Sequence, residues 1–137
     1  MTAFLIADDS PGKLAFLHAV VTGARWPGPV LTAATTEEAI AIVADADIVA
    51  AFVDYEIPSE NGPAIVRALR EKNDAIRIAV VSASDRREYQ ESAREAGAHA
   101  YVCTSHPQDA VIGRLIALLE EWTPEASEGP AASCPAA

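Results

Sequence analysis

Apolar residues are distributed along this chain in five short runs, separated by longer amphipathic segments. The runs cover residues 4–7, 30–34, 48–53, 76–81 and 98–103. Strands covered on both faces are apolar nearly throughout, whereas strands with one solvated face alternate between apolar and polar residues. Five such runs alternating with helical segments therefore predict an α/β fold, in which a parallel sheet carries helices on both faces.

The segments between the runs carry signals for helix ends. The predicted helices cover residues 11–22, a segment that starts at 35 or 36, residues 59 or 60 to 72, 86–96, and 107 or 108 to 122. Ser10 and Pro11 supply an N-cap and a proline for the first helical position, and Ser59 can cap the third helix. The fourth helix is the most polar, so we expect it to pack loosely on the sheet and to have low local stability.

The last predicted helix carries two apolar stripes at helical spacing. The first stripe, which we assign to the core, consists of Val111, Leu115, Leu118 and Trp122. The second stripe lies on another face and consists of Ile112, Ile116 and Leu119. A surface helix needs only one stripe, so the second indicates either a docking or homodimer surface or partial cover by neighbouring helices.

Length and composition limit the class of protein. The 137 residues allow one domain, which we expect to cover residues 1–122, and no second folded output domain in this chain. Residues 123–137 are rich in Pro, Ala and Ser without periodicity, so we expect a flexible tail.

A net charge of −10 opposes direct binding to nucleic acid or to an anionic membrane. The two cysteines form no disulfide framework and no run approaches the roughly 18 apolar residues of a membrane span, which favours the cytoplasm.

Three carboxylates stand directly after two of the predicted strands. Asp8 and Asp9 follow the first apolar run, and Asp54 follows the third. In an open parallel sheet, ligands bind in the crevice outside the carboxyl ends of the strands. If these two strands are neighbours, the three side chains converge on an oxygen-rich pocket that suits Mg²⁺. Acids at strand ends can also be solvated loop residues, but the Pro58 and Gly62 that follow Asp54 favour a rigid loop around a site.

Four motifs follow one another in a recognisable order. They are Asp8-Asp9, Asp54-x3-Pro58-x3-Gly62, Ser82-Ala83 and Gly97-Ala98-x2-Tyr101-Val102. With these motifs the chain resembles, over about residues 3–122, the receiver domain of bacterial two-component response regulators. The resemblance implies a flavodoxin-like (βα)5 three-layer sandwich with the parallel strand order 2-1-3-4-5. In that order the first and third strands are adjacent, which brings the three carboxylates together.

The resemblance also implies functional roles. Asp54 would be the phosphoacceptor, which takes a phosphoryl group from a histidine kinase or phosphotransfer protein with Mg²⁺ as cofactor. The metal ligands would be Asp8, Asp9, Asp54 and the backbone carbonyl of Glu56. Ser82 would bind a phosphoryl oxygen, although its hydroxyl, like that of Ser84, could instead cap the next helix. Tyr101 would change position with the state of the site and so report it to a downstream protein target.

One position of the receiver pattern is altered. Receivers usually carry a lysine and then a proline after the fifth strand, but here these positions are Thr104 and Ser105. The lysine normally pairs with the acceptor carboxylate and then with the phosphoryl group, so its loss removes a charge-assisted contact. The chain has only two lysines, Lys13 and Lys72. Lys13, in the first turn of the first helix, could reach the pocket or could be an ordinary surface residue.

Three functions remain open at this point. The first is a stand-alone receiver that is phosphorylated on Asp54 and signals through protein contacts. The second is a pseudo-receiver that acts as an interaction module without phosphate. The third is a Mg²⁺-dependent phosphohydrolase, which usually needs a second acid two residues after the nucleophile and a substrate cap. Glu56 alone is thin support for the third, so we expect a signalling domain rather than an enzyme.

Overall fold

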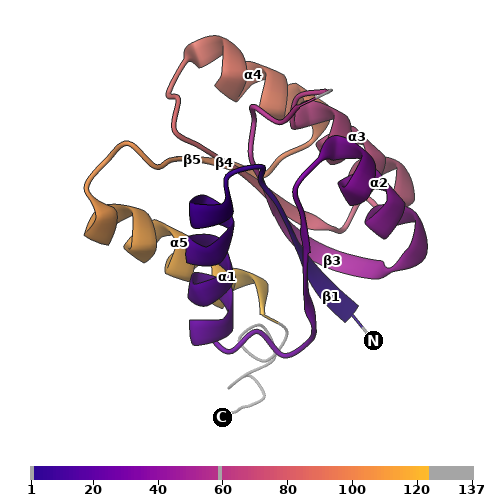
Figure 1. The fold of residues 1–137 in the computed structure, drawn as a ribbon, viewed down its shortest axis with the longest axis horizontal. Coiled ribbons are helices and arrows are strands. Elements are labelled where there is room, and N and C mark those ends of the chain that lie inside the picture. Colours follow the sequence, from indigo (N-terminus) through magenta and orange to yellow (C-terminus); the bar gives the residue numbers. More distant parts are fainter. Residues whose placement is uncertain (1, 59, 124–137) are drawn as a thin grey trace.

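The computed structural model describes residues 2–58 and 60–123 (Figure 1). Its strands are β1 (Thr2–Ala7), β2 (Val30–Ala33), β3 (Asp47–Val53), β4 (Arg77–Ser82) and β5 (Ala100–Cys103). Its helices are α1 (Pro11–Gly23), α2 (Thr36–Asp45), α3 (Pro63–Lys72), α4 (Arg87–Ala96) and α5 (Gln108–Trp122). The strands form one parallel sheet in the order β2-β1-β3-β4-β5, which confirms the predicted flavodoxin-like α/β fold.

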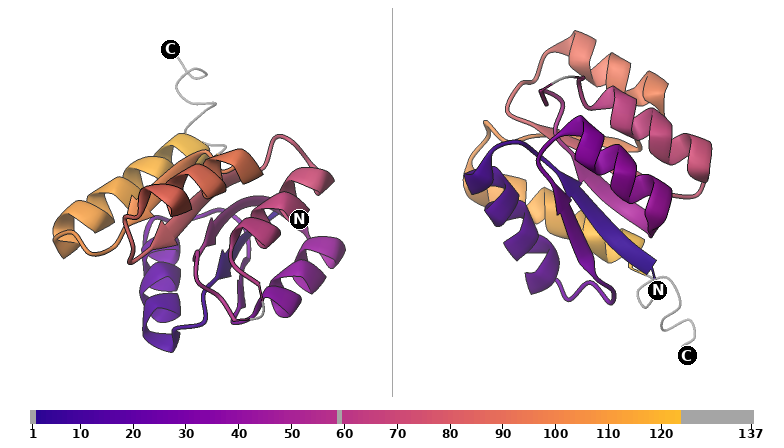
Figure 2. Two further views of the ribbon diagram at one scale, coloured as in Figure 1. Left: turned by 90° about the horizontal axis from the view of Figure 1, so that it is seen from above. Right: turned by 45° about the vertical axis from the view of Figure 1, so that its right-hand side comes forward.

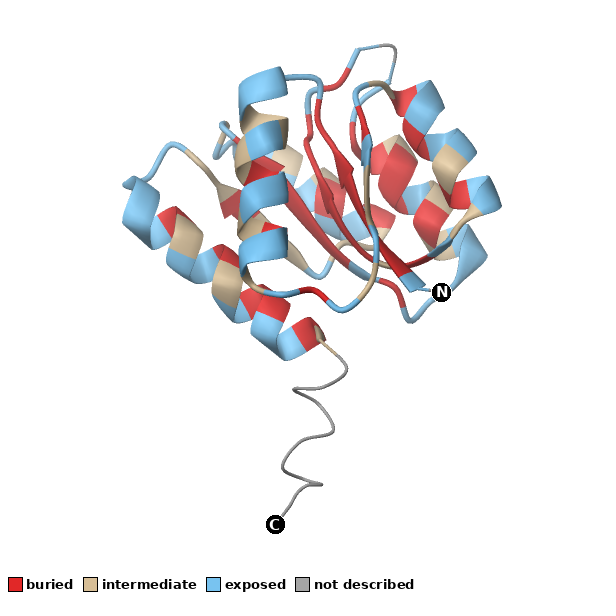
Figure 3. Cartoon of the chain, turned by 60° about the horizontal axis from the view of Figure 1, so that its bottom comes forward, coloured by how far each residue is buried: buried red, intermediate tan, exposed pale blue. Residues whose placement is uncertain are grey.

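Helices cover both faces of the sheet. Helices α1 and α5 lie on one face, and α2, α3 and α4 lie on the other (Figure 2). Because successive side chains of a strand point to opposite faces, each buried strand contributes to two cores. On the side of α1 and α5, the ring centroid of Phe4 lies 5.0 Å from that of Trp26 and 4.9 Å from that of Phe52, in edge-to-face arrangements. The central strands β1, β3 and β4 are accordingly buried over most of their length, whereas the edge strands β2 and β5 are mostly half-buried (Figure 3).

The register of the central strands brings the predicted site together. Ala7 of β1 pairs with Val53 of β3, so the acids that follow these two residues stand at the same level of the sheet. The backbone N–H of Asp54 donates to the carbonyl of Ala7 at 2.8 Å, and that of Asp8 donates to Ala33 at 3.0 Å. The strand ends therefore fix the backbone under both carboxylates.

One predicted helix begins later in the structure than the sequence indicated. α3 starts at Pro63, not at residue 59 or 60, and its N-cap Gly62 makes no side-chain capping bond. The N–H of Gly62 donates to the carbonyl of Tyr55 at 2.6 Å, so the segment before the helix closes as a loop and does not form a helical turn. Since the N-cap is Gly62, the predicted capping by Ser59 is wrong, although Ser59 itself lies outside the described residues. The predicted flexible tail also lies outside the described residues from residue 124 onward and stays a prediction.

The fifth strand is also shorter than predicted. It begins at Ala100 and not at residue 98. Gly97 takes a left-handed conformation with φ 119° at the end of α4, and Ala98 donates its N–H back to the carbonyl of Ala93. These two residues therefore complete the C-terminal cap of α4 before the chain enters the sheet.

The first apolar stripe of α5 is buried as expected, and the second is partly covered. All members of the first stripe are buried, as predicted, but Leu119 of the second stripe is also buried, at 1% exposure. Ile112 and Ile116 are half-buried and line a groove together with Val20 of α1 and its C-cap residue Ala24. The structure thus gives this stripe partial cover by α1, and a homodimer surface on α5 stays a prediction.

Within residues 2–58 and 60–123, no helix is long and apolar enough to span a membrane.

Candidate functional site

Three acids meet at the carboxyl ends of β1 and β3, as the sequence predicted. One carboxylate oxygen each of Asp8, Asp9 and Asp54 lies within 4.8 Å of the others. Asp8 is fully buried, Asp54 is 8% exposed and Asp9 is exposed, so the cluster is open to solvent on one side. The Oδ1 atom of Asp8 accepts a hydrogen bond from the N–H of Ser10 at 2.9 Å, and its buried Oδ2 lies 3.2 Å from the ammonium nitrogen of Lys13. Three carboxylates at this spacing form a donor set that fits a hard cation such as Mg²⁺.

Lys13 extends from the first turn of α1 into this acidic cluster. Its ammonium nitrogen lies 3.1 Å from Oδ1 of Asp54, to which it donates a hydrogen bond, and 3.2 Å from Oδ2 of Asp8. It also donates to the backbone carbonyl of Val81, at the end of β4, at 2.8 Å. Of the two alternatives for this lysine, the structure therefore selects the one in which it reaches the pocket. The ammonium links the ends of three adjacent strands.

The pKa of Asp54 is raised above its usual value. Burial of the carboxylate is the largest cause, because it disfavours the charged form, and the nearby charge of Asp8 acts in the same direction. The positive charge of Lys13 and its hydrogen bond oppose this rise. Burial outweighs the lysine, so the folded protein holds a proton on Asp54 more tightly than the unfolded chain does.

The loop after Asp54 packs closely against the backbone of Asp54 itself. A Cβ atom added to Gly62 would overlap the carbonyl oxygen of Asp54 and press on the Cα of Tyr55. Gly62 has φ −50° and ψ −36°, which any residue can adopt, so the need for glycine here is steric. This close approach fixes the peptide that follows Asp54.

The side chain of Glu56 is engaged on the outside of this loop. Glu56 is exposed, and its Oε2 accepts a hydrogen bond from the hydroxyl of Tyr89 at 2.7 Å. This hydrogen bond ties the side chain of Glu56 to α4. Metal ligation by the backbone carbonyl of Glu56 stays a prediction.

Ser82 and Thr104 occupy the far side of the crevice. Ser82 is 2% exposed, and its Oγ accepts a hydrogen bond from the N–H of Ser84 at 3.2 Å. The N–H of Thr104 donates to the carbonyl of Ser82 at 2.8 Å, which ties the end of β5 to the end of β4. Neither Ser82 nor Ser84 caps α4, because the N-cap of that helix is Arg86. The capping alternative for Ser82 is therefore wrong.

Comparison with known proteins agrees with this geometry. The family model of the response regulator receiver domain matches residues 4–115. The chain belongs to this family. No curated protein matches the sequence.

Solved structures of receivers have the same fold at low sequence identity. A CheY-like response regulator receiver domain from Methanospirillum hungatei JF-1 is 20% identical, with a TM-score of 0.74 over 89% of this chain and 96% of that chain. CheY in the CheX-CheY-BeF3-Mg complex from Borrelia burgdorferi is 21% identical, with a TM-score of 0.73 over 85% of this chain and 88% of that chain. The Mn²⁺-bound response regulator Rcp1 is 13% identical, with a TM-score of 0.76 over 89% of this chain and 94% of that chain.

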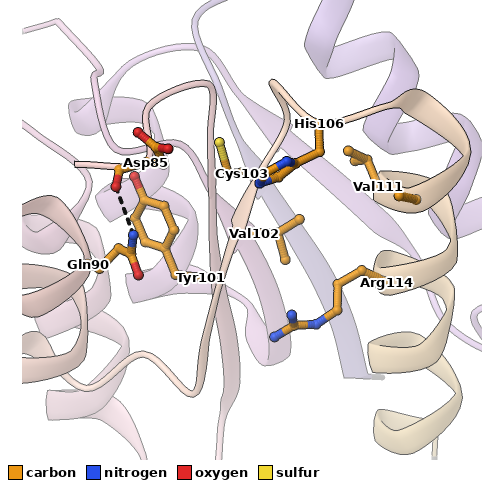
Figure 4. A pocket seen from close by; sticks show the side chains of 9 residues that line it. Asp85, Gln90, Tyr101, Val102, Cys103, His106, Val111 and Arg114 are labelled. Carbon is orange, nitrogen blue, oxygen red and sulfur yellow. Dashed lines mark hydrogen bonds between the residues drawn. The ribbon is translucent and has the colours of Figure 1, made fainter. Parts of the chain in front are cut away.

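Tyr101 of this receiver lies on β5 beside a surface pocket between α4 and α5. Its hydroxyl donates to the backbone carbonyl of Ser84 at 2.6 Å, so the half-buried ring is tied to the loop between β4 and α4. Figure 4 shows the ring next to Gln90 of α4, whose amide donates to the carbonyl of Asp85 at 2.9 Å. Arg114 of α5 lines the opposite side of the same pocket. Tyr101 is therefore tied to the loop between β4 and α4, and its role as a switch stays a prediction.

A second aromatic contact was not predicted from the sequence of this receiver. The rings of Tyr55 and Tyr89 are stacked, with centroids 3.9 Å apart and planes inclined by 7°. The guanidinium of Arg86 lies 5.1 Å from the centroid of the Tyr89 ring. Because Tyr55 directly follows Asp54, this stack joins the loop after β3 to the first turn of α4. The sequence shows only that each of these two separate segments contains a tyrosine. Whether the two rings pair depends on the conformation of the loop after Asp54.

Proposed function

We propose that this receiver accepts a phosphoryl group on Asp54 from a histidine kinase or a phosphotransfer protein. The observation that carries the proposal is the position of Asp54, a nearly buried carboxylate at the end of β3 that touches an ammonium group and lies beside two further acids. Phosphoryl transfer depends mainly on positioning and on electrostatic stabilisation of the transferring group, and such a site supplies both.

Asp54 acts as the nucleophile in this proposal. One of its carboxylate oxygens forms a bond to phosphorus, while the bond between phosphorus and the donor breaks and the donor leaves with the electron pair. Oδ1 is held by Lys13, which orients the carboxylate. The hydroxyl of Ser82, at the end of β4, would donate its proton to a phosphoryl oxygen.

The acidic cluster would hold Mg²⁺ during this reaction. Its ligands would be Asp8, Asp9, Asp54 and the backbone carbonyl of Glu56. When bound, the ion supplies positive charge that neutralises the oxygens of the transferring group. The convergence of the three carboxylates, with one oxygen of each within 4.8 Å of the others, supports this assignment.

Signalling would proceed through protein contacts in the cytoplasm. The net charge of −10 disfavours direct binding to nucleic acid, so the downstream target is proposed to be a protein. The link from Asp54 through Tyr55 to Tyr89 offers one route from the site to the surface of α4. Homodimerisation through α5 is a further possibility, with Ile112 and Ile116 as the candidate contact residues.

A pseudo-receiver that works without phosphate is the second candidate. The ion pairs of Lys13 with Asp8 and Asp54 favour it, since they already partly neutralise the cluster in the absence of a phosphoryl group. A phosphohydrolase has less support. The residue two positions after Asp54 is an acid, Glu56, but its carboxylate accepts a hydrogen bond from Tyr89.

Incubation with acetyl phosphate and Mg²⁺, followed by intact mass measurement, separates the three functions. The proposed receiver should gain the mass of one phosphoryl group, and Asp54→Asn and Asp9→Ala should not. A pseudo-receiver would remain unmodified, and a phosphohydrolase would release phosphate with multiple turnovers. Either of the latter results would refute the proposal.

A further inference from the structure

We propose that Lys13 is the catalytic cation of this receiver, delivered from α1 in place of the lysine that the family carries after the fifth strand. The inference rests on the proposed function and deepens it, because it names the group that stabilises the phosphoryl oxygens on Asp54. Its basis is the pair of contacts from the ammonium to Asp54 and to the Val81 carbonyl, at 3.1 and 2.8 Å.

The start of α1 is built so that Lys13 must point toward the acids. Side chains of a helix tilt toward its N-terminus, and Lys13 is the third residue of α1. The N-cap Ser10 accepts a hydrogen bond from the N–H of Lys13 at 3.4 Å and donates its own N–H to Asp8 at 2.9 Å. The backbone that carries the lysine is thus anchored to the carboxylate that the lysine faces.

The ammonium also lies beside the position where the family lysine is expected. Lys13 holds the carbonyl of Val81, and Thr104 holds the carbonyl of the next residue, Ser82, through its N–H at 2.8 Å. Lys13 and Thr104 further line one surface pocket, together with Phe16, His106, Gln108 and Val111. A lysine at position 104 would therefore enter a region that Lys13 already occupies.

The remaining positive charges make poor substitutes. Lys72, the other lysine of the chain, donates to the backbone carbonyls of Val43 and Ala44 at the far end of α2. In the described residues, Lys13 is the only Lys or Arg that forms an ion pair with Asp8 or Asp54. The side chain of Lys13 is 17% exposed, so much of its charge acts in a region where water screens it weakly.

The role of Lys13 in the transfer step requires no proton movement. An oxygen of Asp54 bonds to phosphorus, the bond from phosphorus to the donor oxygen breaks, and acetate leaves with the electron pair when acetyl phosphate is the donor. Lys13 keeps its proton throughout and donates a hydrogen bond, first to the carboxylate and then to a phosphoryl oxygen. Its contribution is greatest as negative charge gathers on these oxygens.

A relocation experiment tests this assignment. The rate of phosphorylation by acetyl phosphate with Mg²⁺ is measured by intact mass for wild type, Lys13→Gln, Thr104→Lys, the double variant Lys13→Gln/Thr104→Lys, and the control Lys72→Gln. We expect Lys13→Gln to lose a factor of about 10 to 100 in rate, which corresponds to about 1.4–2.8 kcal/mol. The double variant should recover most of the rate, and Lys72→Gln should react like wild type.

Each other outcome has a defined meaning. Phosphorylation of folded Lys13→Gln at the wild-type rate overturns the proposal. If Lys13→Gln does not fold, the double variant decides, because it restores the charge from another element: a folded but inert double variant also overturns the proposal. A wild type that takes no phosphoryl group while Thr104→Lys does would show that Lys13 is no substitute, with Asp54 still an acceptor. No adduct on any variant would instead refute the proposed function, and the inference with it.

Discussion

Replacing Gly62 with alanine should distort the loop that positions Asp54. The added methyl group would overlap the backbone carbonyl oxygen of Asp54 and also crowd Tyr55. Both partners are backbone atoms, so a side-chain rotation cannot relieve the contact and the loop itself must shift. Because the helical φ and ψ of Gly62 suit alanine, the effect contains no conformational penalty and is purely steric.

The expected loss follows from this overlap. Insertion of a methyl group into a packed site typically costs about 1–3 kcal/mol, and we expect the upper half of that range because the neighbour is rigid. Urea unfolding should therefore show a free energy of unfolding about 2–3 kcal/mol below wild type. The same variant should bind beryllofluoride more weakly, since the acceptor carboxylate moves with its backbone.

Gly113→Ala provides a matched control for this experiment. Gly113 lies within α5, where an added Cβ would meet nothing within 4 Å. Alanine has the higher helix propensity, so this variant should gain about 0.5–1 kcal/mol. If Gly62→Ala were as stable as wild type while Gly113→Ala behaved as expected, the close packing of the acceptor loop would be refuted.

Three further predictions address charge, coupling and assembly. Asp54→Asn should have a larger free energy of unfolding than wild type, and the difference should grow as pH rises from below 3.8 through the raised pKa of Asp54. The reason is that the folded wild type must give up a proton that it holds more tightly than the unfolded chain does. Urea unfolding over a pH series checks this, and a difference that shrinks as pH rises contradicts it. A double-mutant cycle of Tyr55→Leu and Tyr89→Leu should give a coupling free energy of about 0.5–1.5 kcal/mol for the stacked pair, and a value near zero would remove the proposed link to α4. Ile116→Glu should leave the domain folded and abolish any self-association through α5 in sedimentation, whereas unfolding would assign this half-buried residue to the core.

The sheet and its acidic edge were predictable because they depend on short-range patterns. Apolar runs that stop at Asp8 and Asp54 define strand ends, and parallel strands bring their carboxyl ends to one edge of a sheet. The adjacency of the two strands, however, came from the family resemblance and not from the runs. The pattern also predicted which residues of α5 face the core, except Leu119, since helical spacing alone does not say how wide a face the sheet and α1 cover.

Features that depend on loop conformation were less accessible. The sequence placed Lys13 near the acidic pair, but its reach to Asp54 and Val81 depends on the length of the side chain and the angle at which α1 leaves the sheet. Likewise, the late start of α3 follows from the bond between Gly62 and Tyr55, a contact within a loop for which no periodicity exists. The stack of Tyr55 on Tyr89 joins segments that are distant in sequence, so it required the folded chain.

Chemical mapping of the phosphorylated residue tests the central claim most directly. Borohydride reduces an aspartyl phosphate to homoserine, and peptide mass analysis then identifies the modified position. After treatment of the full chain with acetyl phosphate and Mg²⁺, the account predicts homoserine at position 54 and none at Asp8 or Asp9. Homoserine at another aspartate position would contradict the assignment of Asp54 as the phosphoacceptor. So would the absence of homoserine after treatment with saturating concentrations of acetyl phosphate and Mg²⁺.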